Sequence, residues 1–168
     1  MPIIEKLQLF ENKSLEIANA LIREIQTFEK IDQQRVIYMM ESYIKSKGLK
    51  TKGPLISSSS GIKGFENGMP VVSTKIIMQL AEPVDICEPP YTFEPLIRIG
   101  PCLYVRFTGK PQQLNFAHAK LGVYAFENDI ELDGSSYTVF VNQNGDDAMI
   151  DVFMPVKKAV NDLEAVHS

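Results

Sequence analysis

The hydrophobic positions of this 168-residue chain follow two different periods, which predict two kinds of secondary structure. Within Ile31–Lys47, Met40 and Ile44 continue an apolar stripe that recurs every three to four positions, and Gln112–Asn128 has the same spacing. A period near 3.6 residues gathers apolar side chains on one face of an α-helix. We therefore expect amphipathic helices over these two segments.

A second group of segments is short, rich in β-branched residues, and alternates apolar with polar positions. This alternation predicts strands, because successive side chains of a strand point to opposite faces. Ile17–Ile25 fits either a strand or a short helix, and Ser57–Gly64 has the composition of a flexible loop. The expected strands are Val71–Leu80, Cys102–Phe107, Tyr137–Val141 and Met149–Val156.

The order of the expected elements repeats once along the chain. Such a repeat predicts an α+β fold of two βαββ units related by a pseudo-two-fold axis, with an antiparallel sheet, both helices on one side, and a central cleft between the units. Residues 1–168 then form a single domain, with repeat one at about 15–82, a proline-rich connector at 83–95, repeat two at about 96–158 and a tail at 159–168. The aligned segments are Leu21–Phe28 with Leu103–Lys110, Val36–Ser57 with Ala117–Thr138, and Lys75–Glu82 with Ile150–Lys157.

The composition fits one domain that binds neither nucleic acid nor membrane. Apolar residues make up 45% of the chain, which is enough for a full core. With 17 Lys and Arg against 21 Asp and Glu, there is no excess positive charge to attract phosphates. Charged residues within Met1–Ser14 leave no uninterrupted apolar region of the kind a targeting signal has, and no apolar run approaches the roughly 18 residues that span a bilayer. We expect a cytoplasmic protein whose Cys87 and Cys102 are both reduced.

Several residues of catalytic type lack the surroundings that catalysis requires. Ser57–Ser60 has no nucleophile-elbow sequence around it. His118 falls on the apolar stripe of the second expected helix, where a core or edge histidine is the commoner role. The histidines and cysteines show no metal-ligand spacing, so the sequence indicates no metal, and no motif demands a cofactor.

Three segments of the second half resemble a known family. They read LYVRFTGKPQQLNFAHAKLGVYAFEND from Leu103, YTVFVNQN from Tyr137 and IDVFMPVKK from Ile150. A strand that runs into a turn before a helix, and a last strand with an acidic, aliphatic and aromatic pattern before Pro-Val, resemble the GyrI-like small-molecule-binding family. That family also occurs as the effector-binding domain of AraC-type and multidrug-responsive activators. The first half matches it in topology only.

The resemblance implies an apolar and aromatic ligand cleft with an acidic residue on the last strand, here Asp151. A carboxylate among aromatic rings offers a cation both a charge partner and π faces. If Val152 points into the helix-packed core, alternation puts Asp151 and Phe153 on the cleft side; a solvent-exposed Asp151 is the alternative. The residues expected around the ligand are Asp151, Phe153, Tyr104, Tyr137, Phe140 and Tyr124, with Ile76 and Met78 from the first copy.

The implied function is a standalone binding protein for a small effector or drug-like molecule of cationic or aromatic character. No helix-turn-helix fits in the first 14 residues, so no DNA-binding domain is expected. A hydrolase of small electrophilic compounds and a gyrase-inhibitor-like protein with a protein partner are the alternatives. The family more often has Glu at Asp151 and Tyr at Phe140, which weakens the hydrolase reading. A Tyr or Glu within reach of Asp151 favours the enzyme, and a purely aromatic and aliphatic lining favours binding.

Overall fold

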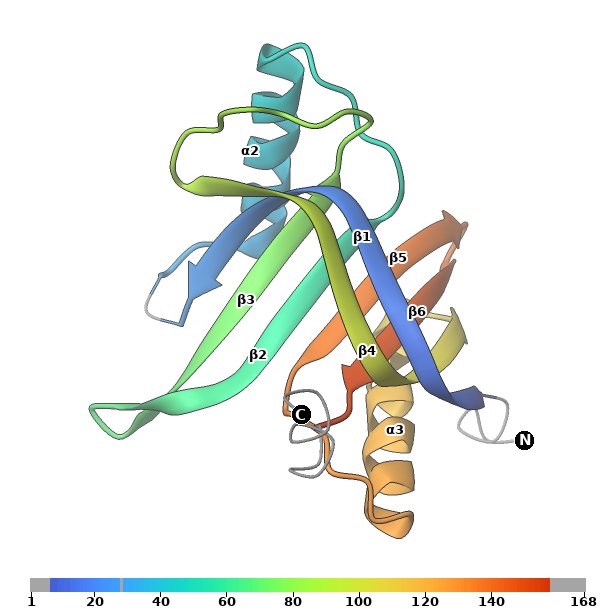
Figure 1. The fold of residues 1–168 in the computed structure, drawn as a ribbon. Coiled ribbons are helices and arrows are strands. Elements are labelled where there is room, and N and C mark those ends of the chain that lie inside the picture. Colours follow the sequence, from blue (N-terminus) through green and yellow to red (C-terminus); the bar gives the residue numbers. More distant parts are fainter. Residues whose placement is uncertain (1–6, 28, 158–168) are drawn as a thin grey trace, which may run out of the picture.

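Each half of the chain runs strand, helix, strand, strand in the computed structural model, which describes residues 7–27 and 29–157 (Figure 1). The first half comprises β1 (Gln8–Gln26), α2 (Gln33–Ser46), β2 (Leu55–Glu66) and β3 (Met69–Gln79). The second half comprises β4 (Tyr91–Gly109), a short 3-10 turn η1 (Pro111–Gln113), α3 (Asn115–Glu127), β5 (Ser136–Asn144) and β6 (Asp147–Pro155). Both helices predicted from the 3.6-residue period are thereby confirmed to within a few residues.

The strands pair antiparallel and close into a barrel in the order β1-β3-β2-β5-β6-β4. Within the first half, β3 lies between β1 and β2; within the second, β6 lies between β4 and β5. The two halves join through two ladders, one between β1 and β4 and the other between β2 and β5. The predicted α+β class and antiparallel sheet are confirmed.

Helix α2 packs on the outer face of the first half. Its first turn is capped by Asp32, whose carboxylate accepts a hydrogen bond from the backbone N–H of Gln34 at 3.3 Å. The stripe Val36, Met40 and Ile44 is buried, as the helical period requires. The strand side chains beneath it are Leu21, Ile25, Ile76 and Met78.

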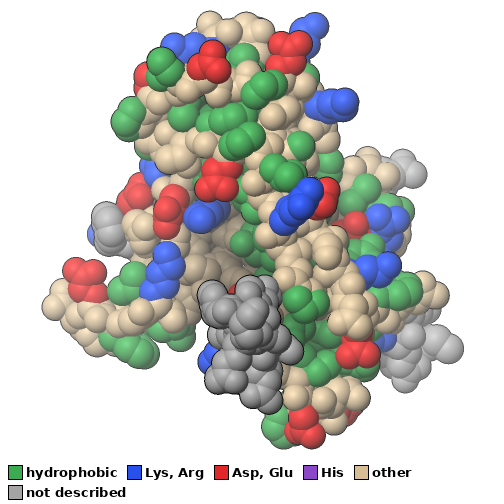
Figure 2. Space-filling model, in the orientation of Figure 1, with side chains coloured by type: hydrophobic (Ala, Val, Ile, Leu, Met, Phe, Trp, Pro, Cys, Tyr) green, Lys and Arg blue, Asp and Glu red, His purple; other side chains and the backbone are tan. Residues whose placement is uncertain are grey.

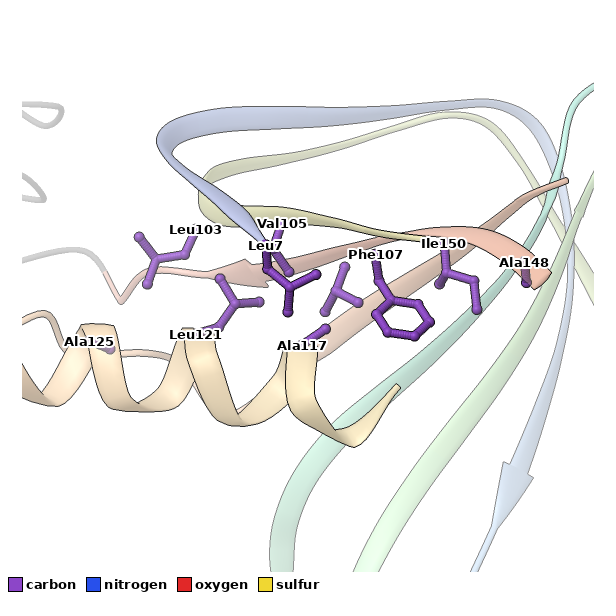
Figure 3. Close-up of a cluster of buried hydrophobic side chains, with 10 residues drawn as sticks. Leu7, Leu103, Val105, Phe107, Ala117, Leu121, Ala125, Ala148 and Ile150 are labelled. Carbon is purple, nitrogen blue, oxygen red and sulfur yellow. The ribbon is translucent and has the colours of Figure 1, made fainter. Parts of the chain in front are cut away.

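Helix α3 packs in the same way on the outer face of the second half, as Figure 3 shows. Its buried stripe is Ala117, Leu121 and Ala125, which are at most 4% exposed. Burial of such side chains stabilises the fold by roughly 25 cal/mol for each Å² of apolar surface removed from water. The strand side chains beneath the helix are Leu103, Val105, Phe107, Ala148, Ile150 and Val152.

The other face of the strands points into the barrel. On β6, Val152 lies under α3 while Phe153 lies inside; on β3, Ile76 lies under α2 while Ile77 lies inside. Adjacent residues of a strand must separate in this way. Both helices therefore cover the outer side of the sheet and leave its inner side to a separate cluster. That cluster comprises Leu15, Ile17, Ala20, Ile22, Ile56, Ile77, Cys102, Val139 and Phe153.

Two expected boundaries are wrong. Ser57–Gly64 is not a loop but part of β2, because its backbone pairs with β3 on one side and with β5 on the other. Those ladder hydrogen bonds outweigh the weak strand preference of serine and glycine. The connector ends at Pro90 rather than at residue 95, since Tyr91 begins β4. The ambiguous Ile17–Ile25 belongs to β1.

Candidate functional site

An ion pair between neighbouring strands forms a polar centre on the inner side of the barrel. Asp151 on β6 lies directly opposite Arg106 on β4, so the two side chains emerge on the same face. Arg106 Nε donates to Asp151 Oδ1 at 2.7 Å, and Nη2 donates to Oδ2 at 3.0 Å. This two-point fork is among the strongest geometries for an arginine and a carboxylate.

Tyr104 completes the polar group, since its hydroxyl donates to Asp151 Oδ1 at 2.9 Å. Burial, together with this hydrogen bond, raises the pKa of Tyr104, and the phenol therefore keeps its proton at neutral pH. The hydrogen bonds to Asp151 also raise the pKa of Arg106. The side chain of Asp151 is 12% exposed and that of Arg106 is 48% exposed, so the guanidinium is the part of the pair that meets solvent.

Aromatic rings form a row beside the ion pair. The ring of Tyr104 lies 4.8 Å from that of Phe153 and 5.9 Å from that of Phe10, centroid to centroid. Phe10 is 42% exposed and is the accessible end of the row. Lys13 places its Nζ 5.3 Å from the Phe10 ring centroid, so a cation of the protein already lies over that ring.

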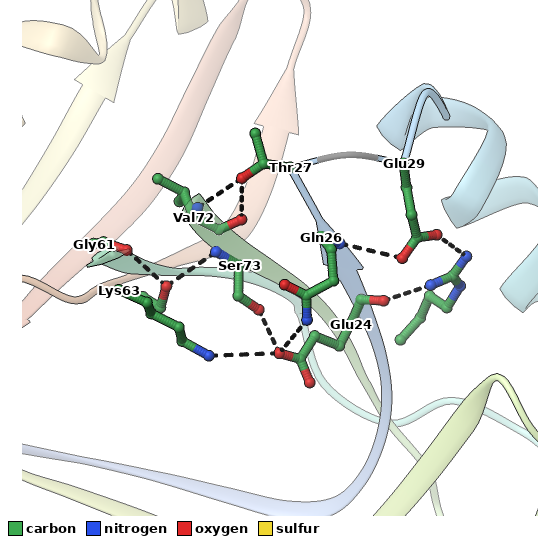
Figure 4. Close-up of polar contacts among 10 residues, drawn as sticks. Glu24, Gln26, Thr27, Glu29, Gly61, Lys63, Val72 and Ser73 are labelled. Carbon is green, nitrogen blue, oxygen red and sulfur yellow. Dashed lines mark hydrogen bonds and ion pairs between the residues drawn. The ribbon is translucent and has the colours of Figure 1, made fainter. Parts of the chain in front are cut away.

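The first half contributes a second polar cluster to the inner face (Figure 4). Glu24 on β1 lies opposite Lys75 on β3, two residues from the inward-facing Ile77. One oxygen of Glu24 accepts a hydrogen bond from the Ser73 hydroxyl at 2.5 Å and lies 3.7 Å from Lys63 Nζ. The Ser73 hydrogen bond contributes most to a lowered pKa of Glu24, and the two lysines add to it. Each half thus presents a carboxylate with its own cation.

Four of the eight residues expected around the ligand come together on this inner side. Asp151 bonds to Tyr104, and Tyr104 and Tyr137 pack against the interior cluster that contains Phe153. Tyr137 lies opposite Phe153 in the ladder between β5 and β6, and burial raises the pKa of its phenol. The space-filling view shows the surface hollowed between the β2–β3 hairpin and the β1–β4 pair (Figure 2).

The other four residues lie on the helix side of the sheet. Phe140 and Ile76 line a groove of about 490 Å³ between the start of α2 and the β5–β6 hairpin. Met78 lines a separate cavity of about 650 Å³ at the end of α2. Tyr124 is on α3, where a hydrogen bond with Glu11 raises its pKa. The structure therefore does not bring these four side chains to Asp151.

The sequence alignment that placed Ile76 and Met78 in the site is displaced by one residue along β3. The sequence alignment matched Ile76 with Asp151. In the ladders, however, Asp151 pairs with Arg106, and Lys75 pairs with Glu24. The sequence alignment places Glu24 at the position of Arg106. Under the repeat predicted from the sequence, Lys75 and not Ile76 would correspond to Asp151. A slip of one residue moves every side chain of a strand to the other face.

Arg106 and Phe10 are the site residues that the sequence reasoning missed. Arg106 lies two positions after Tyr104 on the same predicted strand, and the period of two would have placed both on one face. Phe10 had no such signal. Its position opposite Tyr104 depends on the register between β1 and β4, which shifts at irregularities on either side of Lys13.

Other chemistry is limited in the part of the chain that the structure describes. There, no three His, Cys, Asp or Glu side chains gather where a metal ion could be held, and no helix has the length and apolar character needed to cross a membrane. Cys87 and Cys102 are separate thiols. Burial raises the pKa of Cys102 to about 11, which disfavours its reactive thiolate at neutral pH.

Comparison with solved structures identifies the fold. EcmrR in its complex with DNA superposes with a TM-score of 0.62 at 14% sequence identity, over 91% of this chain but only 58% of the EcmrR chain. The C-terminal domain of EcmrR alone gives a TM-score of 0.59 at 14% identity, over 91% of this chain and 99% of that domain. This chain has the fold of that domain.

A hydrolase encoded by lin2189 from Listeria innocua shares the same architecture. Its TM-score is 0.53 at 14% identity, over 90% of this chain and 91% of the hydrolase. No family model matches this chain, and no curated protein matches its sequence. At these identities the likeness concerns the fold alone, and function must be argued from the site.

Proposed function

We propose that this chain is a small-molecule-binding protein of the GyrI-like type, which holds an aromatic, amphipathic ligand on the inner side of the barrel. The observation that carries the proposal is the row of Phe10, Tyr104 and Phe153 beside the hydrogen-bonded carboxylate of Asp151. Small-molecule sites commonly combine apolar and aromatic walls with a few fixed polar groups. The resemblance of the second half to the GyrI-like family supports the same function.

We also propose that a pseudo-two-fold axis relates the two halves. The ladder between β1 and β4 includes the pair Glu16 and Arg98, which lie 82 positions apart in the sequence. The ladder between β2 and β5 includes Ser57 and Thr138, which lie 81 positions apart. These separations match the offsets at which the halves align, and a two-fold axis requires such self-corresponding pairs. The inner face is then one site built by both halves.

Single tryptophans can test where a ligand binds, because the chain has none of its own. Phe10 on the inner side and Phe140 in the helix-side groove are 42% and 40% exposed, which makes Phe10→Trp and Phe140→Trp a matched pair. We use diphenylmethanol as the probe, since it is uncharged, carries two rings and one hydroxyl, and absorbs below the tryptophan band. Titration is expected to shift the emission of Phe10→Trp saturably and to leave Phe140→Trp unchanged.

Two outcomes contradict the proposal. A saturable shift in Phe140→Trp alone assigns the ligand to the helix-side groove. No saturable shift in either variant, together with an unchanged Tm of the unmodified chain, contradicts binding of this ligand class. Occupancy at 100 times Kd adds about 2.7 kcal/mol to the free energy of unfolding and would raise Tm.

Hydrolysis is the second candidate function, because Tyr104 lies within hydrogen-bond distance of Asp151. In that role the Tyr104 hydroxyl would be the general acid, which must lie within hydrogen-bond distance of the substrate atom that it protonates. The geometry favours binding, since Arg106 and Tyr104 together occupy both oxygens of the carboxylate. Turnover of styrene oxide that Tyr104→Phe abolishes would support the hydrolase; turnover by neither protein would exclude it for this substrate class.

A further inference from the structure

Arg106 occupies the place that a cationic ligand would take at Asp151. Its Nε and Nη2 reach both carboxylate oxygens at 2.7 and 3.0 Å, and the Tyr104 hydroxyl adds a third donor. A carboxylate that already accepts three hydrogen bonds, two of them charge-assisted, has little left to offer another cation. The sequence-based expectation of a cation at Asp151 did not include this internal partner.

The exposure of the two side chains makes Arg106 the group that an incoming ligand meets. Arg106 is 48% exposed, whereas Asp151 behind it is 12% exposed. A ligand cation that displaced the guanidinium would have to replace its hydrogen bonds and remain close to a like charge. A neutral or anionic polar group meets no such cost, because the remaining N–H groups of Arg106 can donate hydrogen bonds to its lone pairs without leaving Asp151.

Other groups of the inner face also have cations of the protein beside them. Lys13 lies over the exposed ring of Phe10, and Glu24 is held by Ser73 and flanked by Lys63. The first half thus also supplies the cation for its own carboxylate. Two further acidic residues, Glu94 and Asp133, act on the pKa of the Tyr137 phenol; both are exposed, so water screens their charge.

We infer that Arg106 is the internal counter-ion that sets the charge specificity of the site, and that the ligand is an amphipathic aromatic molecule without net positive charge. This inference rests on the proposed binding function and adds the class of ligand to it. Arg106 is a specificity-determining residue in this account, and Asp151 positions its guanidinium.

Two probes of equal shape and opposite charge test the inference. Tetraphenylphosphonium and tetraphenylborate each carry four phenyl groups, so the ratio of their Kd values reports the charge preference and cancels most of the shape. The wild-type protein is expected to bind the phosphonium no more tightly than the borate. Arg106→Gln uncovers Asp151 and is expected to shift the ratio about tenfold toward the phosphonium. Asp151→Asn leaves Arg106 unpaired and is expected to shift it about tenfold toward the borate.

The double variant Arg106→Gln/Asp151→Asn is the matched control, and its ratio is expected to return close to that of the wild type. It also keeps the test decisive if Arg106→Gln fails to fold, because the comparison with Asp151→Asn alone still isolates the effect of the guanidinium. Circular dichroism establishes that each variant is folded.

The failures of the two proposals differ. If the wild type binds both probes but prefers the phosphonium, and Arg106→Gln leaves that preference unchanged, the inference is overturned. The proposed binding function then still stands. Binding of neither probe to any of the four proteins overturns the inference and counts against the proposed function as well.

Discussion

Ser73 is 1% exposed, and both its hydroxyl and its backbone N–H have partners. Its hydroxyl donates to Glu24 at 2.5 Å, and its backbone N–H donates to the hydroxyl of Ser60 at 3.0 Å. Within residues 7–27 and 29–157, no buried side-chain nitrogen or oxygen lacks a hydrogen bond. An unpaired buried group costs about 1–3 kcal/mol, which the hydrogen bonds of these buried polar atoms avoid.

Ser73→Ala is expected to make stability less sensitive to acid. The pKa of Glu24 is lowered in the folded state, so Glu24 contributes stability above the ordinary value of 4.5 and loses it as pH falls below that value. Without the Ser73 hydroxyl the folded-state pKa rises toward the ordinary value. Urea unfolding should show the variant to be about 1 kcal/mol less stable than the wild type at pH 7. The difference in free energy of unfolding should be smaller at pH 3.

Ser46→Ala is the control for this measurement, because the Ser46 hydroxyl bonds only to the backbone oxygen of Tyr43 in the hydrogen bonds described. Its effect on stability should not change with pH. If the loss of stability caused by Ser73→Ala stays constant or grows as the pH falls, Ser73 does not act through Glu24.

At the scale of elements, the sequence predicted the helices well and the strands less well. The helical period is local, so the stripes under α2 and α3 could be read from one segment at a time. Strand β2 was missed because its serines are held by backbone pairing with β3, which follows it in the chain, and with the distant strand β5. The slip between Ile76 and Lys75 has the same origin, since register is set by partners and not by composition.

Substitutions on the buried and exposed faces of helix α3 should differ in their effect on the free energy of unfolding. Leu121 is 0% exposed and packs on the strands of the second half, whereas Val123 is 54% exposed. Leu121→Ala is expected to lower the free energy of unfolding by about 2–5 kcal/mol, and Val123→Ala to change it by less than about 0.5 kcal/mol. Urea denaturation of both variants measures this, and equal losses would mean that α3 packs by another face.

At the scale of the whole molecule, the closed barrel brings the halves together at two ladders and leaves one inner face between them. From the sequence, Asp151, Phe153, Tyr104 and Tyr137 could be predicted on that face, because they lie on strands whose alternation is clear. Arg106 was passed over, and Phe10 could not be found, since a β-bulge region of β1 determines where it lies. Of these two unforeseen residues, Arg106 balances the charge of Asp151, and Phe10 extends the row of aromatic rings.

A ligand that binds on the inner side of the barrel, and not under the helices, contacts the inward-facing side chains of β3. Ile76 and Ile77 are adjacent in β3, are each 1% exposed, and face opposite sides of the sheet. Methyl NMR of isoleucine-labelled protein during titration with diphenylmethanol distinguishes the two sides of the sheet. We predict saturable shifts of the δ1-methyl of Ile77 with little change at Ile76; shifts confined to Ile76, or to neither residue, would contradict it.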